Sequence, residues 1–194
     1  MDALDDEIGG QLLRIAAGDR GAFAALVESQ WAPLFRFLDG VARDRAAAED
    51  ALQDAFVSVW KNAGTFRGEA SGRTWLYTVA RNALHRRHRR RADRPGAAEP
   101  LDTLEELGAA AGWGDPSSED RVLSALDDRD RVHRALRRLS GDDREVVVLL
   151  DVEELSAKEA AEALGIGLAA LKSRLHRARL RLVAELQKEE RDGG

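Results

Sequence analysis

The chain of 194 residues contains no cysteine, which excludes disulfide bridges and metal sites built from thiolates. No uninterrupted run of apolar residues approaches the ~20 that a membrane-spanning helix needs. Four of the first seven residues are acidic, namely Asp2, Asp5, Asp6 and Glu7, whereas a secretory signal begins with basic residues. We therefore expect a cytoplasmic protein that does not insert into a membrane.

Proline is also scarce, and three of the four prolines lie close together at Pro95, Pro100 and Pro116. The surrounding strip is rich in glycine, and residues 95–128 carry nine acidic side chains against one arginine. A segment of this composition cannot bury enough apolar surface to hold a regular element. The sequence therefore predicts a linker over 95–127 that joins a domain of residues 1–94 to a domain of residues 128–194.

Basic residues are not in excess overall, since the formal net charge is −5, but they are gathered in two places. Residues 66–94 hold nine arginines against two acids, and residues 168–188 hold six basic side chains against Glu185 alone. Charges more than ~8 to 10 Å apart act almost independently in physiological salt. Each of these two basic islands can therefore attract a polyanion although the whole chain is acidic.

Apolar residues recur at the three-and-four spacing of an amphipathic helix in the stretches 23–41, 52–63 and 76–84. Glycines break the pattern between the second and third stretches, at residues 64–72. Phe66 lies in this break and matches no apolar stripe. We therefore predict a small helical bundle with one loop that stands away from its core.

The C-terminal part has the pattern of a helix-turn-helix. Ser156 and Glu159 form a capping box, a glycine turn follows at 165–167, and a longer basic helix begins near 168. Ser173, His176 and Arg177 face away from the apolar stripe of that last helix, and Lys172, Arg174 and Arg179 lie on the shoulders of the stripe. Side chains of these types suit the major groove. Charge alone favours a solvated amphipathic helix, but the preceding capped helix and glycine turn reverse that preference in favour of DNA binding. The predicted fold class is all-α, with two small helical domains.

Two groups of motifs resemble one known family. Residues Ala48–Trp60, the loop Phe66–Ser71 and the segment Thr74–Asn82 resemble region 2 of an extracytoplasmic-function (group IV) sigma factor of bacterial RNA polymerase. Residues Leu171–Arg179 resemble region 4 of the same family. The resemblance implies that the protein binds core RNA polymerase and directs it to promoter DNA. It also implies inhibition by an anti-sigma factor, and neither enzymatic activity nor a cofactor.

The resemblance also implies roles for individual residues. The surface for core polymerase comprises Glu49, Asp50, Gln53, Asp54 and Val57, whose acids suit a basic partner. The minus-ten DNA surface comprises Phe66, Arg67, Gly68, Glu69, Ala70, Ser71, Arg81, Arg86, Arg87 and Arg90. Its loop would hold an unstacked base and its arginines would contact phosphates. The minus-thirty-five duplex would be read by five residues of the last helix: Lys172, Ser173, Arg174, His176 and Arg177.

Four aromatic or imidazole side chains receive plainer interpretations. Trp75 and Tyr77 are expected to pack in the core rather than to act as wedges between bases. His85 and His88 lie one helical turn apart, which is the spacing of a metal pair. Among so many arginines a cation is disfavoured, so we expect no metal and assign both histidines to the basic face.

Three alternatives remain open from the residues alone. A helix-turn-helix regulator with an N-terminal helical sensing domain does not explain the glycine-broken basic loop at 64–72. A nuclease or recombinase needs clustered carboxylates or an activated nucleophile, and Tyr77, the only tyrosine, has no acid beside it in the sequence. An adaptor that merely holds acidic proteins would use the basic islands without reading DNA.

Overall fold

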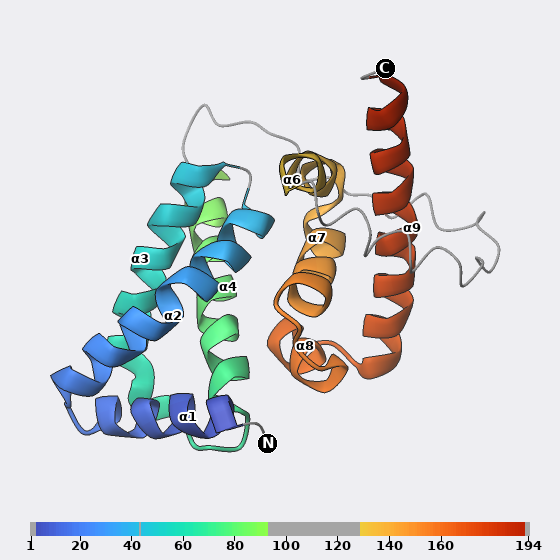
Figure 1. Cartoon of the computed structure of the whole chain (residues 1–194). Helices are drawn as coiled ribbons and strands as arrows, with labels where there is room; N and C mark the ends of the chain where they lie inside the picture. The colour runs from blue at the N-terminus through green and yellow to red at the C-terminus, as the bar shows by residue number, and fades with distance from the viewer. Residues whose placement is uncertain (1–2, 43, 93–128, 193–194) are drawn as a thin grey trace.

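The computed structural model describes residues 3–42, 44–92 and 129–192, and all regular structure within these ranges is helical. The N-terminal bundle consists of α1 (Ala3–Ala16), α2 (Arg20–Val41), α3 (Arg45–Asn62), the short turn η1 (Ala63–Thr65) and α4 (Gly72–Ala92). The C-terminal bundle consists of α6 (Arg129–Arg138), α7 (Gly141–Val147), the π-helical turn η3 (Val148–Val152), α8 (Ala157–Leu164) and α9 (Leu168–Asp192). Figure 1 shows the two bundles side by side. The predicted linker lies outside the described residues.

Helix α1 was not predicted, although its sequence contains a short amphipathic signal. Ile8, Leu12 and Ile15 are spaced by four and three residues, and all three are buried. The helix crosses the ends of its neighbours and contacts α2, α4 and η1 (Figure 1). Gly72 permits this crossing, because a Cβ atom on Gly72 would lie 2.5 Å from the backbone nitrogen of Gly9.

The three predicted apolar stripes form α2, α3 and α4, and most of their residues are buried as expected. Aspartates begin two of these helices: Asp19 accepts a hydrogen bond from the amide of Ala22, and Asp44 accepts one from Ala47. Two tryptophans differ from the expected pattern. Trp31 is 47% exposed and Trp60 is 38% exposed.

The C-terminal bundle confirms the helix-turn-helix. Both hydrogen bonds of the capping box between Ser156 and Glu159 are present at the start of α8. Gly165 ends α8 with φ of +68°, in the left-handed region that glycine adopts most easily. Helix α9 follows after two further residues, and its inner face consists of buried residues that include Leu171, Ala178 and Leu182.

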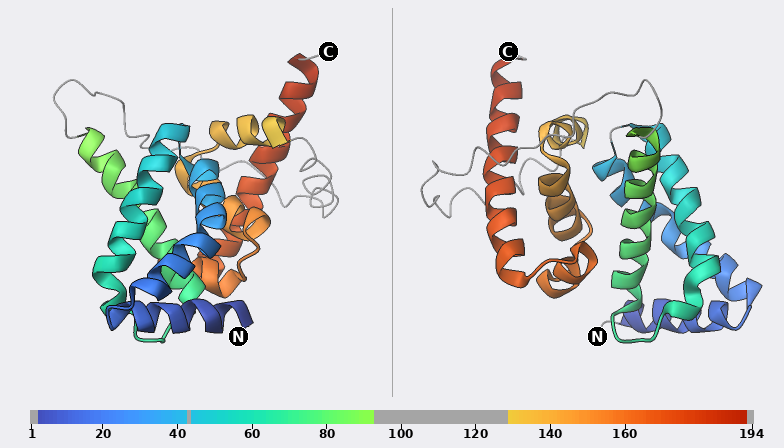
Figure 2. Two further views of the ribbon diagram at one scale, coloured as in Figure 1. Left: turned by 60° about the vertical axis from the view of Figure 1, so that its left-hand side comes forward. Right: turned by 180° about the vertical axis from the view of Figure 1, so that it is seen from behind.

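The two bundles are in direct contact, which the sequence did not predict. Helices α2 and α4 of the N-terminal bundle pack against α6, α7, η3 and α8 (Figures 1 and 2). At one point the contact is very close, because a Cβ atom on Gly40 would lie 3.2 Å from both methyl carbons of Val148. The buried guanidinium of Arg144 also crosses the interface, and its Nη1 donates to the carbonyl oxygen of Val41 at 2.9 Å.

Candidate nucleic-acid and partner interfaces

Helix α9 presents the predicted duplex-reading side chains to solvent. Lys172, Ser173, His176 and Arg177 are all exposed, on the side of the helix opposite its buried leucines. Arg174 is half-buried and forms an ion pair with Asp142 at 3.2 Å. The predicted exposure of this face is therefore confirmed for four of the five residues, and the fifth lies at its margin.

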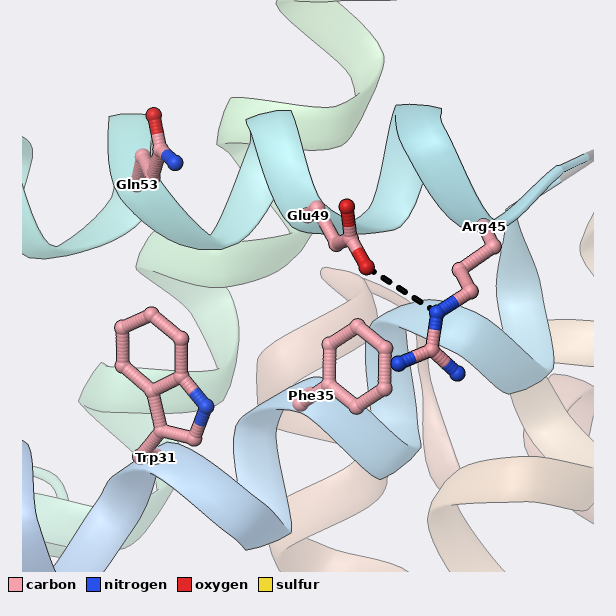
Figure 3. Close-up of a pocket in the computed structure, with 5 residues that line it drawn as sticks. All are labelled: Trp31, Phe35, Arg45, Glu49 and Gln53. Atoms are coloured by element: carbon pink, nitrogen blue, oxygen red, sulfur yellow. Dashed lines mark hydrogen bonds and ion pairs between the residues drawn. The ribbon is translucent and has the colours of Figure 1, made fainter.

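The predicted polymerase residues lie along α3, and three of them, Glu49, Gln53 and Val57, are exposed. Beside them a groove of about 330 Å³ opens between α2 and α3 (Figure 3). Its lining consists of Trp31, Phe35, Arg45, Glu49 and Gln53. The groove therefore adds aromatic surface from α2 to the acidic face of α3.

Two of these lining residues, Trp31 and Phe35, were not recognised as candidates from the sequence. Trp31 matches the apolar stripe of α2, yet it is 47% exposed and stacks on Phe56 with ring centroids 5.9 Å apart. The Arg45 guanidinium lies over the Phe35 ring at 5.0 Å and donates to Glu49 at 2.9 Å. An exposed aromatic on a core stripe is invisible to a periodicity argument, because periodicity does not show which stripe positions lie at the edge.

The remaining predicted polymerase residues, Asp50 and Asp54, contact a predicted DNA-binding arginine. Arg87 of α4 forms ion pairs with both aspartates, and its Nη1 lies 3.1 Å from Oδ2 of Asp54. Arg86 donates to the hydroxyl of Ser58 at 2.9 Å. The acidic surface of α3 and the basic surface of α4 are thus joined directly.

The loop at 66–71 differs from its prediction in one respect. Phe66 is buried, and its ring lies edge-on to that of Trp75 with centroids 6.0 Å apart. The expectation that Phe66 stands away from the core is wrong because α1 supplies the missing surface: a Cβ on Gly9 would lie 3.7 Å from the Phe66 ring. Arg67, Gly68 and Glu69 are exposed as expected, and Ala70 and Ser71 are half-buried.

The two remaining aromatic predictions are confirmed. Tyr77 is buried and Trp75 is half-buried in the N-terminal bundle. Both therefore pack within the fold and are not presented as wedges on its surface. The side chains of His88 and Arg90 lie outside the described part of the structure.

Glu145 is one of two buried carboxylates that enter the N-terminal bundle from the C-terminal bundle. Its side chain is 2% exposed, Arg81 Nε donates to it at 2.7 Å, and His85 Nε2 contacts its other oxygen. Burial alone would raise the pKa of Glu145, but the bonds from His85 and Arg81 outweigh burial and hold that pKa below its usual value. A predicted minus-ten residue, Arg81, is thus occupied by the other bundle.

Glu153 is the second such carboxylate, and its side chain is fully buried. Arg36 donates to both of its oxygens, at 2.9 and 3.2 Å, and the Tyr77 hydroxyl donates at 2.7 Å. Burial, followed by the charge of Glu153, raises the pKa of Tyr77, and the bond to Glu153 raises the pKa of Arg36. Arg73 donates to the backbone carbonyl of Glu153. No local sequence pattern identified these residues, because their partners lie far away in the chain.

The sequence of the chain was compared with protein-family models and with known proteins. The family model of sigma-70 region 2 matches residues 26–94, and that of sigma-70 region 4 matches residues 129–182. The chain is 36% identical over 166 residues to the ECF RNA polymerase sigma factor SigM of Mycobacterium tuberculosis, covering 86% of this chain and 78% of that protein. It is 32% identical over 173 residues to the sigma factor CnrH of Cupriavidus metallidurans, covering 88% and 90% respectively.

Solved structures agree with this class. The sigma factor RpoE of Bartonella quintana, in complex with the anti-sigma factor NepR, is similar with a TM-score of 0.65 and 25% identity, over 85% of this chain and 96% of that one. CnrH in complex with the cytosolic domain of CnrY has the same fold, with a TM-score of 0.68 and 24% identity over 94% and 99% of the two chains.

The fold and these family matches therefore define an alternative initiation factor of the sigma-70 class, which directs RNA polymerase to promoters. Within that class the chain belongs to the extracytoplasmic-function sigma factors. In the described ranges, no helix is both long and apolar enough to cross a membrane.

Proposed function

We propose that the chain divides promoter recognition between its two domains in the cytoplasm, by binding and without catalysing a reaction itself. Residues 1–94 bind core polymerase and hold melted minus-ten DNA. Residues 128–194 read the minus-thirty-five duplex, and 95–127 connect the two. The observation that carries this proposal is the exposed face of Lys172, Ser173, His176 and Arg177 on the second helix of a capped helix-turn-helix. Transcription from a promoter by core polymerase plus this chain tests it, because a ligand-sensing regulator would not replace a sigma factor.

The proposed polymerase surface is the outer face of α3 together with the groove beside it. It combines the exposed Val57, at 52%, and Trp31, at 47%, with the carboxylates of Glu49, Asp50 and Asp54. An aromatic and apolar centre with charged neighbours is the usual composition of a protein interface. The acids favour a basic partner, which would compete with Arg45 and Arg87 for them.

Reversing Asp50 and Asp54 to lysine is expected to weaken assembly with core polymerase by at least about tenfold, because two attractive contacts become repulsive. Affinity is measured by titrating core enzyme into the labelled protein at physiological salt. The control is the double variant Glu7→Lys/Glu162→Lys, which changes net charge equally at exposed positions on α1 and α8, outside this surface. Equal affinity of the test variant and the wild type would remove this surface from the proposal.

For minus-ten DNA we propose that the exposed members of the loop, Arg67, Gly68 and Glu69, meet the displaced strand. Gly68 has φ of +72°, a backbone conformation that residues other than glycine rarely adopt. Because glycine has no side chain, the backbone at this position can approach a ligand closely. The buried Phe66 anchors the loop through Trp75. The arginines of α4, including Arg86, Arg87 and Arg90, would neutralise phosphates without reading sequence.

Single arginine variants are expected to separate the two kinds of DNA binding. Arg177→Ala should reduce affinity for minus-thirty-five duplex by about 1–3 kcal/mol if it pairs with a guanine. Arg67→Ala should leave that affinity unchanged and impair strand opening. Duplex binding and permanganate footprinting of the melted strand, applied to the same variants, measure the two steps. Lys188→Ala, at the far end of α9, is the matched control, and a shared defect of Arg177→Ala and Arg67→Ala in one step would contradict the division.

We also propose that an anti-sigma factor inhibits the chain by covering surfaces of both domains. Support comes from the similar RpoE, which was solved in complex with its anti-sigma factor. The chain offers such a partner an acidic face on α3 and a basic face on α9. It has no thiol of its own, so a response to oxidants would have to reside in the partner.

A further inference from the structure

The first turn of α9 is apolar and exposed. It consists of Leu168, Ala169 and Ala170. The Leu168 side chain is 48% exposed, and both alanines are exposed as well. The helix is regular from its start, because the amide of Leu171 donates to the carbonyl oxygen of Gly167 at 2.9 Å. The helix therefore presents apolar side chains to solvent at the point where it begins.

This turn continues the face proposed for duplex reading. Leu168 lies four residues before Lys172, and Ala169 lies four residues before Ser173. Side chains four residues apart lie one above the other on a helix. The apolar turn is therefore the N-terminal end of the surface that would enter the major groove.

The position of the turn gives its side chains a direct part in base recognition. In a helix-turn-helix, the N-terminal residues of the second helix contact the base edges. The first cation of α9 is Lys172, one turn further along. Three arginines of the helix form ion pairs with acids of α7 and η3: Arg174, Arg179 and Arg181. Any base contact by the side chains of the first turn is therefore made by carbon atoms and not by a hydrogen bond.

We propose that Leu168 and Ala169 are specificity-determining residues, which recognise the C5-methyl group of a thymine in the upstream promoter element. Among the four bases, only thymine presents a methyl group in the major groove. An apolar side chain pressed against donors or acceptors of another base would leave them without a partner, which is unfavourable. The inference rests on the proposed reading of the minus-thirty-five duplex by α9, and it adds which base the first turn selects.

The test uses core polymerase with the full chain bound. This complex first selects its upstream element from promoters that are randomised there, and we expect thymine at a fixed position. That thymine is then replaced by deoxyuridine, which lacks only the methyl group. We expect affinity to fall about fourfold, as for the loss of one buried methyl group. Competition binding at physiological salt measures the change.

The variant Leu168→Ala/Ala169→Gly is expected to bind the thymine and uracil promoters equally, because the carbon atoms that contact the methyl group are gone. Leu13→Ala is the matched control, since Leu13 is an equally apolar side chain that is 56% exposed on α1. That control should keep the fourfold preference. A thymine preference that survives in the double variant would overturn the assignment to Leu168 and Ala169.

A second measurement needs no variant. Cytosine and 5-methylcytosine at the same position differ only by the methyl group, and the methylated base should bind about fourfold more tightly. Equal affinity within both base pairs of the comparison, thymine with uracil and cytosine with its methylated form, would overturn the inference.

Arg177→Ala distinguishes that result from failure of the proposed function. If α9 reads the duplex but its first turn recognises no methyl group, this variant still weakens binding to the thymine and uracil promoters alike. If α9 does not read the duplex, Arg177→Ala leaves both affinities unchanged.

Discussion

Replacing Gly72 with alanine is expected to lower the free energy of unfolding of the N-terminal bundle by about 3 kcal/mol. The added Cβ would lie 2.5 Å from the nitrogen and 2.9 Å from the Cα of Gly9, and 3.0 Å from the carbonyl carbon of Ile8. These are backbone atoms, so no change of side-chain rotamer relieves the overlap. Helix α1 must move away from α4, and the buried Ile8 and Leu12 must move with it.

Urea unfolding followed by tryptophan fluorescence measures this effect, since Trp31, Trp60 and Trp75 all lie in the N-terminal bundle. The expected result is a lower midpoint with an unchanged slope. Gly10→Ala, on α1 beside Gly9, is the control, because a Cβ on Gly10 would meet no neighbouring segment within 4 Å. That control should be neutral or stabilising by up to about 1 kcal/mol. A Gly72→Ala midpoint as high as that of the control would show that α1 is not packed against α4.

Replacing Arg144 with methionine is expected to destabilise the C-terminal bundle by about 3–5 kcal/mol. Its buried guanidinium donates to the carbonyl oxygens of Leu136, Arg137 and Leu139 at 2.8 to 3.0 Å, where α6 ends. It also donates to Val41 at the end of α2. Methionine fills a similar volume but donates no hydrogen bond, so several carbonyls would be left without this partner.

Thermal unfolding followed by circular dichroism measures the loss. Arg144→Lys should be intermediate, because a lysine keeps the charge but not the planar fork that reaches several carbonyls at once. Arg137→Met provides the control: that arginine is exposed on the neighbouring helix, and its loss should change stability by less than about 0.5 kcal/mol. Equal stability of the Arg144→Met and Arg137→Met variants would mean that water replaces the lost donors.

The sequence predicted the local features of the fold well because they depend on neighbours along the chain. The capping box at Ser156, the turn at Gly165 and the exposed face around Arg177 all follow from helical periodicity and capping chemistry. Features that depend on distant segments were missed. Phe66 appeared unpartnered because its neighbour α1 was not recognised, and no role was predicted for Glu153 because its partners lie in the other bundle.

The same limit applies to the candidate sites. Their residue types and spacing predicted where acidic and basic faces would lie. They did not predict that Arg87 pairs with Asp50 and Asp54, or that Arg81 pairs with Glu145. A charge pattern gives the sign of a surface, but the pairing of two charges depends on how the helices pack.

Gly40 illustrates how one position can act oppositely on two equilibria. Gly40 lies in the last turn of α2, where an alanine would favour the helix over glycine by up to about 1 kcal/mol. The added methyl would lie 3.2 Å from both methyls of Val148, so Val148 would have to give way and the two bundles would fit less closely. Selection for thermal stability of the N-terminal bundle alone would therefore favour a larger residue than glycine at position 40. The same substitution would weaken the contact between the two bundles. Glycine is therefore the residue expected at position 40 where the close contact between the two bundles matters more than the stability of α2.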